Sequence, residues 1–258
     1  MAKHKRKTLA AVHATPVPVT PAAGIERVAS IDALRAIAIL AMVAYHFAFD
    51  LRFFGVIGAD FENDRFWLTA RATIVTSFLL LAGISLVLAD HAGVKGPRFM
   101  RRVALIALCA LAASIASYVI YPQTYITFGI LHCIALSLLV ARPLAPKPAA
   151  AVALGVVVVA TGLLLAHPAF DQRLTSWIGF TTHKPATQDY VPLFPWLGVL
   201  LLGVGLGHAL LRAQFRPIAA LGRAPRPLLW MGRHSLAIYM VHQPLLMGAL
   251  WLMLRLRA

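Results

Sequence analysis

Residues 27–51 read RVASIDALRAIAILAMVAYHFAFDL, an apolar run of membrane length that nevertheless contains Arg35 and His46. A membrane-spanning helix needs about 20 mostly apolar residues. Eleven helical steps of about 100° place His46 within roughly 20° of Arg35 and about 16 Å further along the axis. Ionisable groups inside such a segment are costly and usually line a cavity or a path. The run therefore predicts a transmembrane helix that carries chemistry on one face.

Two carboxylates accompany this pair. Asp32 lies three residues before Arg35, a spacing that allows an ion pair on a helix. Asp50 lies four residues after His46, so the two share a helix face, and the carboxylate is placed to fix the imidazole tautomer. The alternative is that Asp50 is simply the first residue of the following loop.

The composition extends the membrane assignment to most of the chain. Of the 258 residues, 60% are hydrophobic and 13% are charged, whereas about 25% charged residues are usual in a soluble domain. The candidate spans are 33–53, 67–89, 103–121, 126–141, 149–166, 192–211 and 235–254, of which the fourth is short. We expect an all-α, polytopic helical membrane bundle of about seven transmembrane helices.

The charges alternate between the connections. Basic residues precede the first run and follow the second, fourth and sixth: Lys3, Lys5, Arg6, Lys7, Arg27, Lys95, Arg98, Arg101, Arg102, Arg142, Lys147, Arg212, Arg216, Arg223, Arg226 and Arg233. Most acids fall in the other connections: Asp50, Asp60, Glu62, Asp64, Asp171 and Asp189. This alternation predicts a cytoplasmic N-terminus, with Arg255 and Arg257 as the misfits. The net charge of +15 is thereby explained by topology and contact with anionic membrane lipids, and no nucleic-acid partner is expected.

The sequence predicts two parts. Residues 1–26 are basic and then rich in Ala, Pro and Thr, which favours a disordered cytoplasmic tail. Residues 27–258 form one integral membrane domain.

Further polar residues fall within or beside the apolar runs. They are Arg71, His132, Asp189, Tyr190, Tyr239, His242 and Gln243. We expect them to converge on one cavity that opens outward near Asp50, His132 and Tyr190, where they bind a polar substrate. The alternative is that the histidines are separate packing residues. No His-x-x-x-His pair, HExxH motif or cysteine-rich pattern occurs, so no metal is expected.

Five segments resemble one known family in the same order along residues 27–250. They are IDALRAIAILAMVAYHFAFDL, FLLLAGISL, FGILHCIALSLL, DYVPLFPWLGVLLLG and GRHSLAIYMVHQPLL. Together they resemble the small bacterial relatives of heparan-α-glucosaminide N-acetyltransferase. The spacing of Arg35 and His46, and the closing segment, are also similar to the type-3 membrane acyltransferases.

The resemblance implies an enzyme of the bacterial inner membrane. It would move an acyl group, acetyl in the first instance, from cytoplasmic acyl-CoA to a sugar amine or hydroxyl at the outer side, without a permanently bound cofactor. Arg35, Arg233 and Ser235 would then bind acyl-CoA. His46, Asp50 and His132 would be catalytic, with His46 as general base or transient acyl carrier.

The chain also departs from this family. Ala36 stands where the family usually has Gly after the Arg. The proposed catalytic histidine of the animal lysosomal enzyme lies in the loop after the first span, but no histidine occurs between Leu51 and Asp90.

Two other classes of function remain open from the sequence. A proton-coupled transporter or flippase would use the histidines and Arg71 for protons or solute, and would usually show inverted repeats. A non-catalytic membrane scaffold would bury Arg35 and His46 with no connected cavity.

Overall fold

The computed structural model describes residues 28–256, so the tail expected over residues 1–26 lies outside the described part of the chain. The long helices are α1 (Ala29–Phe53), α2 (Arg65–His91), α3 (Gly96–Ile120), α6 (Leu193–Arg212) and α8 (Ser235–Arg255). The shorter α-helices are α4 (Ile130–Ala141), α5 (Pro148–Leu164) and α7 (Arg226–Arg233). The 3₁₀ turns are η1 (Arg142–Leu144), η2 (Pro168–Phe170), η3 (Ser176–Ile178) and η4 (Arg216–Arg223). Within residues 28–256 the fold is helical, as expected, with one isolated β-bridge between Phe128 and Tyr190.

Helix starts follow local sequence signals. The carboxylate of Asp64 accepts a 2.8 Å hydrogen bond from the amide of Phe66 and thereby caps α2. Prolines stand in the first turns of α3, α5 and α7, where the missing amide proton has no helical partner to lose. Acidic Asp32 lies in the first turn of α1, where it complements the positive end of the helix dipole.

Five helices are long and apolar enough to span a membrane: α1, α2, α3, α6 and α8. The chain is therefore a multi-pass membrane protein. The two remaining candidates are shorter apolar helices, and the 12 residues of α4 extend only about 18 Å against a hydrocarbon core of about 30 Å. Seven crossings and a cytoplasmic N-terminus stay predictions.

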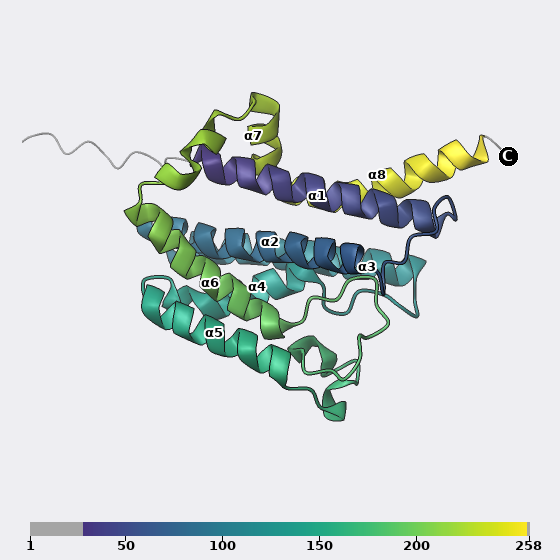
Figure 1. Ribbon diagram of the computed structural model, residues 1–258, viewed down its shortest axis with the longest axis horizontal. Helices are drawn as coiled ribbons and strands as arrows, with labels where there is room; N and C mark the ends of the chain where they lie inside the picture. The colour runs from purple at the N-terminus through teal and green to yellow at the C-terminus, as the bar shows by residue number, and fades with distance from the viewer. Residues whose placement is uncertain (1–27, 257–258) are drawn as a thin grey trace, which may run out of the picture.

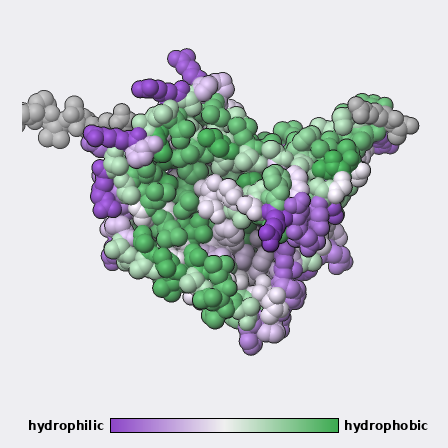
Figure 2. Space-filling view, viewed as in Figure 1, coloured by the Kyte–Doolittle hydropathy of each residue, from purple (hydrophilic) through white to green (hydrophobic). Residues whose placement is uncertain are grey.

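The surface agrees with this assignment. Figure 2 shows a broad hydrophobic area, with hydrophilic residues gathered toward the two sides of the view. Large apolar side chains on the long helices are exposed, including Leu108, Val119 and Leu245. In water such exposure would be costly, whereas in a bilayer these side chains contact lipid.

The helices form layers (Figure 1). In the view shown, α1 and α8 lie above α2, and α4, α5 and α6 lie below it. Helix α6 packs against both α2 and α5, and α1 packs against α2, α7 and α8. The described chain starts beside α7 at one end of the bundle and ends with α8 at the other.

Close packing of α6 depends on glycine. A Cβ at Gly203 of α6 would lie 2.5 Å from the carbonyl oxygen of Leu80 on α2. One at Gly198 would lie 2.6 Å from the carbonyl oxygen of Gly155 on α5. The main apolar core lies between these helices and α4, with Leu79, Leu200 and Leu201 fully buried. The α1–α8 seam lies outside that core and carries the polar residues His46, Asp50, His242 and Gln243.

The connection between the sixth and seventh candidate spans has more structure than expected. The sequence predicts a basic loop, but the residues form η4 and α7, which pack against α1. This segment places Arg233 against the start of α1.

Candidate functional site

One buried carboxylate organises the end of the bundle where α1 begins. Asp32 is 2% exposed and contacts two arginines. The Arg35 Nη1 lies 3.1 Å from Oδ1, which confirms the expected pair, and the Arg233 Nε lies 3.2 Å from Oδ2. Within residues 28–256, two positive charges therefore share this one carboxylate.

Close backbone contact holds this arrangement. A Cβ at Gly232 of α7 would overlap the backbone carbonyl of Asp32, so only glycine allows α7 to approach α1 this closely. On the other side of Arg35, its Nη2 donates a 2.6 Å hydrogen bond to the hydroxyl of Ser85 on α2. The Arg35 side chain is thus held by contacts from α1 and α2, while α7 packs against its partner Asp32.

A cavity of about 200 Å³ lies beside Arg35, between α1, α2, α3, α4 and α8. Its polar lining residues are Arg35, Ser85, Arg102, Ser235 and Tyr239, and the rest of the lining is apolar. Ser235 does not cap α8 as its position suggests: His234 occupies the cap, and Ser235 is the first helical residue.

A polar cluster lies deeper in the α1–α8 seam. The rings of His46 and His242 are 4.9 Å apart, edge to face. The amide of Gln243 donates a 2.6 Å hydrogen bond to Oδ1 of Asp50. Asp50 is 1% exposed and lies inside α1, which rules out the alternative that it begins a loop. Its hydrogen bond comes from α8 and not from His46.

Three atoms of this cluster are buried without a hydrogen-bond partner among the described residues. They are Oδ2 of Asp50, Nε2 of His242 and Oε1 of Gln243. An unpaired buried polar group costs about 1–3 kcal/mol, and native proteins contain few of them. These unpaired atoms make the cluster a candidate binding site for a polar molecule.

Tyr239 links the cavity to the cluster. Its side chain lines the cavity, while its backbone oxygen lies 2.6 Å from Nδ1 of His242. Tyr121, which follows α3, flanks the cluster from outside the membrane-spanning helices. Burial, and then the neighbouring Asp50 carboxylate, raise the pKa of Tyr121.

His132 lies in a different set of contacts. The amide of Gly129 donates to its Nδ1 at 3.2 Å, and its Nε2 lies 3.4 Å from the hydroxyl of Ser114 on α3. Ser114 belongs to α3, and Gly129 is the residue directly before α4. The structure therefore does not bring His132 into contact with His46 or Asp50 among the described residues, and its catalytic role stays a prediction.

Asp189 also belongs to the start of α4. Its Oδ2 accepts a 2.8 Å hydrogen bond from the amide of Ile130. Burial raises the pKa of the Asp189 carboxyl, while the Ile130 bond and the charges of Arg71 and Lys184 act in the opposite direction. Arg71 and Asp189 are thus electrostatic neighbours.

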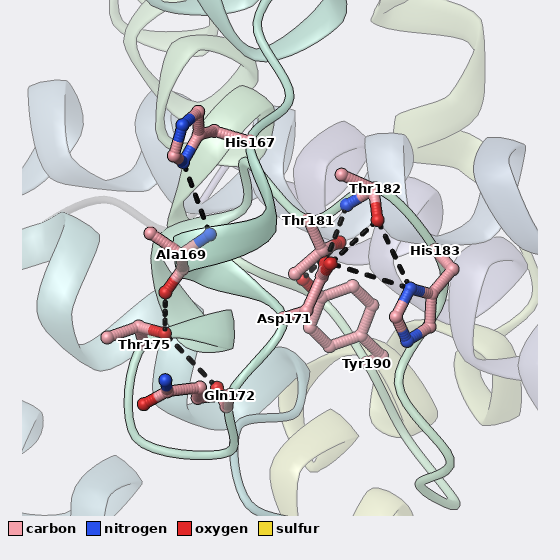
Figure 3. Close-up of polar contacts among 9 residues, drawn as sticks. All are labelled: His167, Ala169, Asp171, Gln172, Thr175, Thr181, Thr182, His183 and Tyr190. Atoms are coloured by element: carbon pink, nitrogen blue, oxygen red, sulfur yellow. Dashed lines mark hydrogen bonds and ion pairs between the residues drawn. The ribbon is translucent and has the colours of Figure 1, made fainter.

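Tyr190 lies in the long connection between α5 and α6, drawn in Figure 3. Its hydroxyl donates to the backbone oxygen of Ser176 at 2.8 Å, and burial raises the pKa of the phenol. In the same connection, the carboxylate of Asp171 accepts two 2.7 Å hydrogen bonds from Thr182 (Figure 3). These bonds tie the connection into a compact loop.

The structure thus groups the expected residues into three neighbourhoods and not into one cavity. Arg35, Arg233 and Ser235 lie at the entrance; His46, Asp50, His242 and Gln243 form the cluster; His132, Asp189 and Tyr190 surround the start of α4. Asp50, His132 and Tyr190 do not line the cavity described above.

Sequence reasoning missed two serines of the site. Ser85 bonds Arg35, and Ser114 contacts His132. Ser85 lies in FLLLAGISL, one of the five segments that resemble the family, so the resemblance could have pointed to this serine.

No curated protein and no solved structure matches the chain. A family match does cover most of it, from residue 27 to residue 244. This range contains the entrance, the cavity and the polar cluster. The chain belongs to the family described as heparan-alpha-glucosaminide N-acetyltransferase, catalytic.

Proposed function

We propose that the protein is an acetyltransferase of the bacterial inner membrane. It moves an acetyl group from cytoplasmic acetyl-CoA to an amine or hydroxyl of a sugar on the opposite side. The observation that carries this proposal is the polar cluster of His46, Asp50, His242 and Gln243 within membrane-length helices of a chain from this family.

The entrance suits the donor. Arginine binds phosphates through its planar guanidinium, and acetyl-CoA carries several phosphate charges. Arg35 and Arg233 lie beside the basic segments η4 and α7, whose arginines attract these phosphates. The cavity beside Arg35 then provides an apolar path for the thioester arm toward Tyr239 and the cluster.

The cluster suits acyl transfer. The acceptor must lose a proton as its nitrogen or oxygen attacks the thioester carbonyl carbon, and the C–S bond then breaks to release CoA. Two routes start from this geometry: His46 removes that proton, or His46 first carries the acetyl group and passes it on. Neither route needs a bound metal or cofactor.

The cavity and the breaks in the helices help to distinguish an enzyme from a scaffold or a transporter. A scaffold predicts that Arg35 and His46 are buried with no connected space, but Arg35 lines a cavity that reaches Tyr239. A transporter predicts matching broken helices in two halves. Helix α8 has Pro244 in its middle, whereas α6 has Pro195 in its first turn, directly after the non-helical Phe194, so the two breaks do not match in position. Both features favour the enzyme.

The test uses the purified full-length protein in sealed proteoliposomes. Labelled acetyl-CoA is supplied on one face and a panel of amino sugars and glycans on the other. The wild type is compared with His46→Ala, Arg35→Ala and the control His208→Ala, which removes a histidine on α6 that bonds Ala145. All variants are first checked for folding.

The proposal predicts labelled acceptor with the wild type and the control. His46→Ala should lose about 10²–10⁴-fold in rate, and Arg35→Ala should mainly raise the KM for acetyl-CoA. Absence of labelled acceptor across the panel, together with no acetyl-CoA binding, would sink the proposal.

A further inference from the structure

We propose that His242 is a second catalytic residue, whose Nε2 takes the proton from the acceptor, while His46 serves the acetyl donor. This inference rests on the proposed function and assigns the two histidines of the cluster to separate steps. It rests on the hydrogen-bond contacts of His242 and of the polar atoms beside it.

The tautomer of His242 is fixed by its backbone partner. Nδ1 of His242 lies 2.6 Å from the backbone oxygen of Tyr239. A carbonyl oxygen only accepts hydrogen bonds, so Nδ1 carries the proton. In a neutral imidazole the other nitrogen then has a free lone pair, which makes Nε2 the basic atom.

That basic atom has no partner within the described residues. Nε2 of His242 is buried, and the residue as a whole is 8% exposed. Buried polar atoms are nearly always hydrogen-bonded, so this atom is a candidate for contact with a bound molecule. Its lone pair can accept a hydrogen bond from an N–H or O–H group of that molecule.

The neighbouring unpaired atoms are hydrogen-bond acceptors too. Oδ2 of Asp50 is a carboxylate oxygen, and Oε1 of Gln243 is the acceptor left over when the amide nitrogen donates to Asp50. Three acceptors thus lie together on α1 and α8. They complement a ligand rich in N–H or O–H donors, which the acceptor substrate is and the thioester is not.

Two other histidines, on α4 and α6, show the contrast. His132 receives the Gly129 amide at Nδ1 and contacts Ser114 through Nε2. His208 uses Nε2 to bond the backbone oxygen of Ala145 at 2.7 Å. Neither leaves a buried lone pair open at Nε2, whereas His242 does.

The acceptor N–H or O–H bond breaks, and its proton goes to Nε2 of His242. The lone pair so released forms a bond to the acetyl carbon, which reaches the cluster on the thioester or on His46, 4.9 Å away ring to ring. The bond from the acetyl carbon to sulfur or to His46 breaks, and the leaving atom takes a proton back through His242.

The test compares His242→Asn with the wild type and with His208→Asn as the matched control. An asparagine amide can still donate to the Tyr239 backbone oxygen, so it keeps the structural bond but removes the basic Nε2. Acetyl transfer to glucosamine is measured against pH, and acetyl-CoA binding is measured by equilibrium dialysis. His242→Ala is assayed with and without added imidazole.

We expect His242→Asn to lose about 10²–10⁴-fold in kcat/KM, to bind acetyl-CoA as the wild type does, and to lose the rise of rate with pH that reports a neutral imidazole base. Imidazole should restore part of the activity of His242→Ala. His208→Asn should keep the wild-type profile.

Three results would contradict the proposed role of His242, and each has a different meaning. If the wild type transfers acetyl to no acceptor, the proposed function fails and the role of His242 fails with it. If the wild type is active and His242→Asn matches it, only the role of His242 is overturned. Loss of acetyl-CoA binding in His242→Asn, with no imidazole rescue of His242→Ala, would make His242 a structural residue and overturn the inference too.

Discussion

The amide of Gln243 on α8 donates a 2.6 Å hydrogen bond to the carboxylate of Asp50 on α1, which is 1% exposed. Residues 193 positions apart in sequence are thereby joined inside the membrane-spanning part of the fold. This bond is the only side-chain hydrogen bond of Asp50 within the described residues, because its other carboxylate oxygen has no partner.

Replacing Gln243 by Leu should therefore leave the buried carboxylate without any donor. We expect the free energy of unfolding to fall by about 1–3 kcal/mol, since a stranded buried acceptor bears its full desolvation cost. Thermal unfolding of the purified protein measures the loss. In an Asp50→Leu background the same substitution should cost much less, and equal costs in both backgrounds would show that the bond contributes nothing.

Gly232→Ala tests the contact between α7 and α1. A methyl group there would overlap the Asp32 carbonyl, so α7 must move away and carry Arg233 off the carboxylate. We expect weaker acetyl-CoA binding and a lower unfolding temperature. Gly248→Ala on α8 is the control, because nothing lies within 4 Å of the added Cβ. Unchanged donor affinity in Gly232→Ala would contradict the assignment of Arg233 to the entrance.

His132 can be tested by two substitutions that separate a structural role from catalysis. Its Nδ1 accepts the Gly129 amide at the start of α4, so His132→Ala should destabilise the protein by about 0.5–2 kcal/mol, as loss of a cap does. His132→Asn retains an acceptor and should recover most of that stability, with transfer activity within about tenfold of wild type. A well-folded His132→Asn protein with a hundredfold lower rate would instead restore His132 to the catalytic set.

The loop between α5 and α6 should loosen in acid. Hydrogen bonds from the Thr182 side chain and backbone hold the pKa of Asp171 below its ordinary value of about 3.9. A depressed carboxyl pKa stabilises the fold above about pH 3.9, and this contribution is lost as the pH falls through the folded-state pKa. Limited proteolysis of the loop against pH should show this opening.

Asp171→Asn provides the comparison for that experiment. It cannot change charge, so cleavage of its loop should already be faster at neutral pH and should vary less between pH 5 and pH 2. If wild type and variant respond to acid identically, the Thr182 bonds are not what closes the loop.

The sequence predicted the helices well because membrane helices are defined by apolar runs. Each of the seven expected segments is a helix, and the last begins at Ser235 as expected. It failed where a segment is neither apolar nor a simple loop. Helix α7 was missed because its 8 residues mix Arg with Leu and Trp, and its position depends on contact with α1.

The site shows the same limit. Spacing along one helix predicted the Asp32–Arg35 pair, which the structure confirms. Spacing did not predict that Asp32 also binds Arg233, 201 residues away, or that Gln243 reaches Asp50. Such contacts depend on how each helix is rotated about its own axis, and that rotation is set by the packing of the whole bundle.

The glycine contacts of α6 restrict the substitutions that this sequence can accept during evolution. Because α6 meets α2 and α5 backbone against backbone, even one added methyl group at Gly198 or Gly203 demands a shift of whole helices. The residues at these contacts touch no candidate catalytic group, so related chains should keep small side chains there while acceptor preference diversifies in the loop before α6. Substrate range can then change without disturbing the packing of the helices.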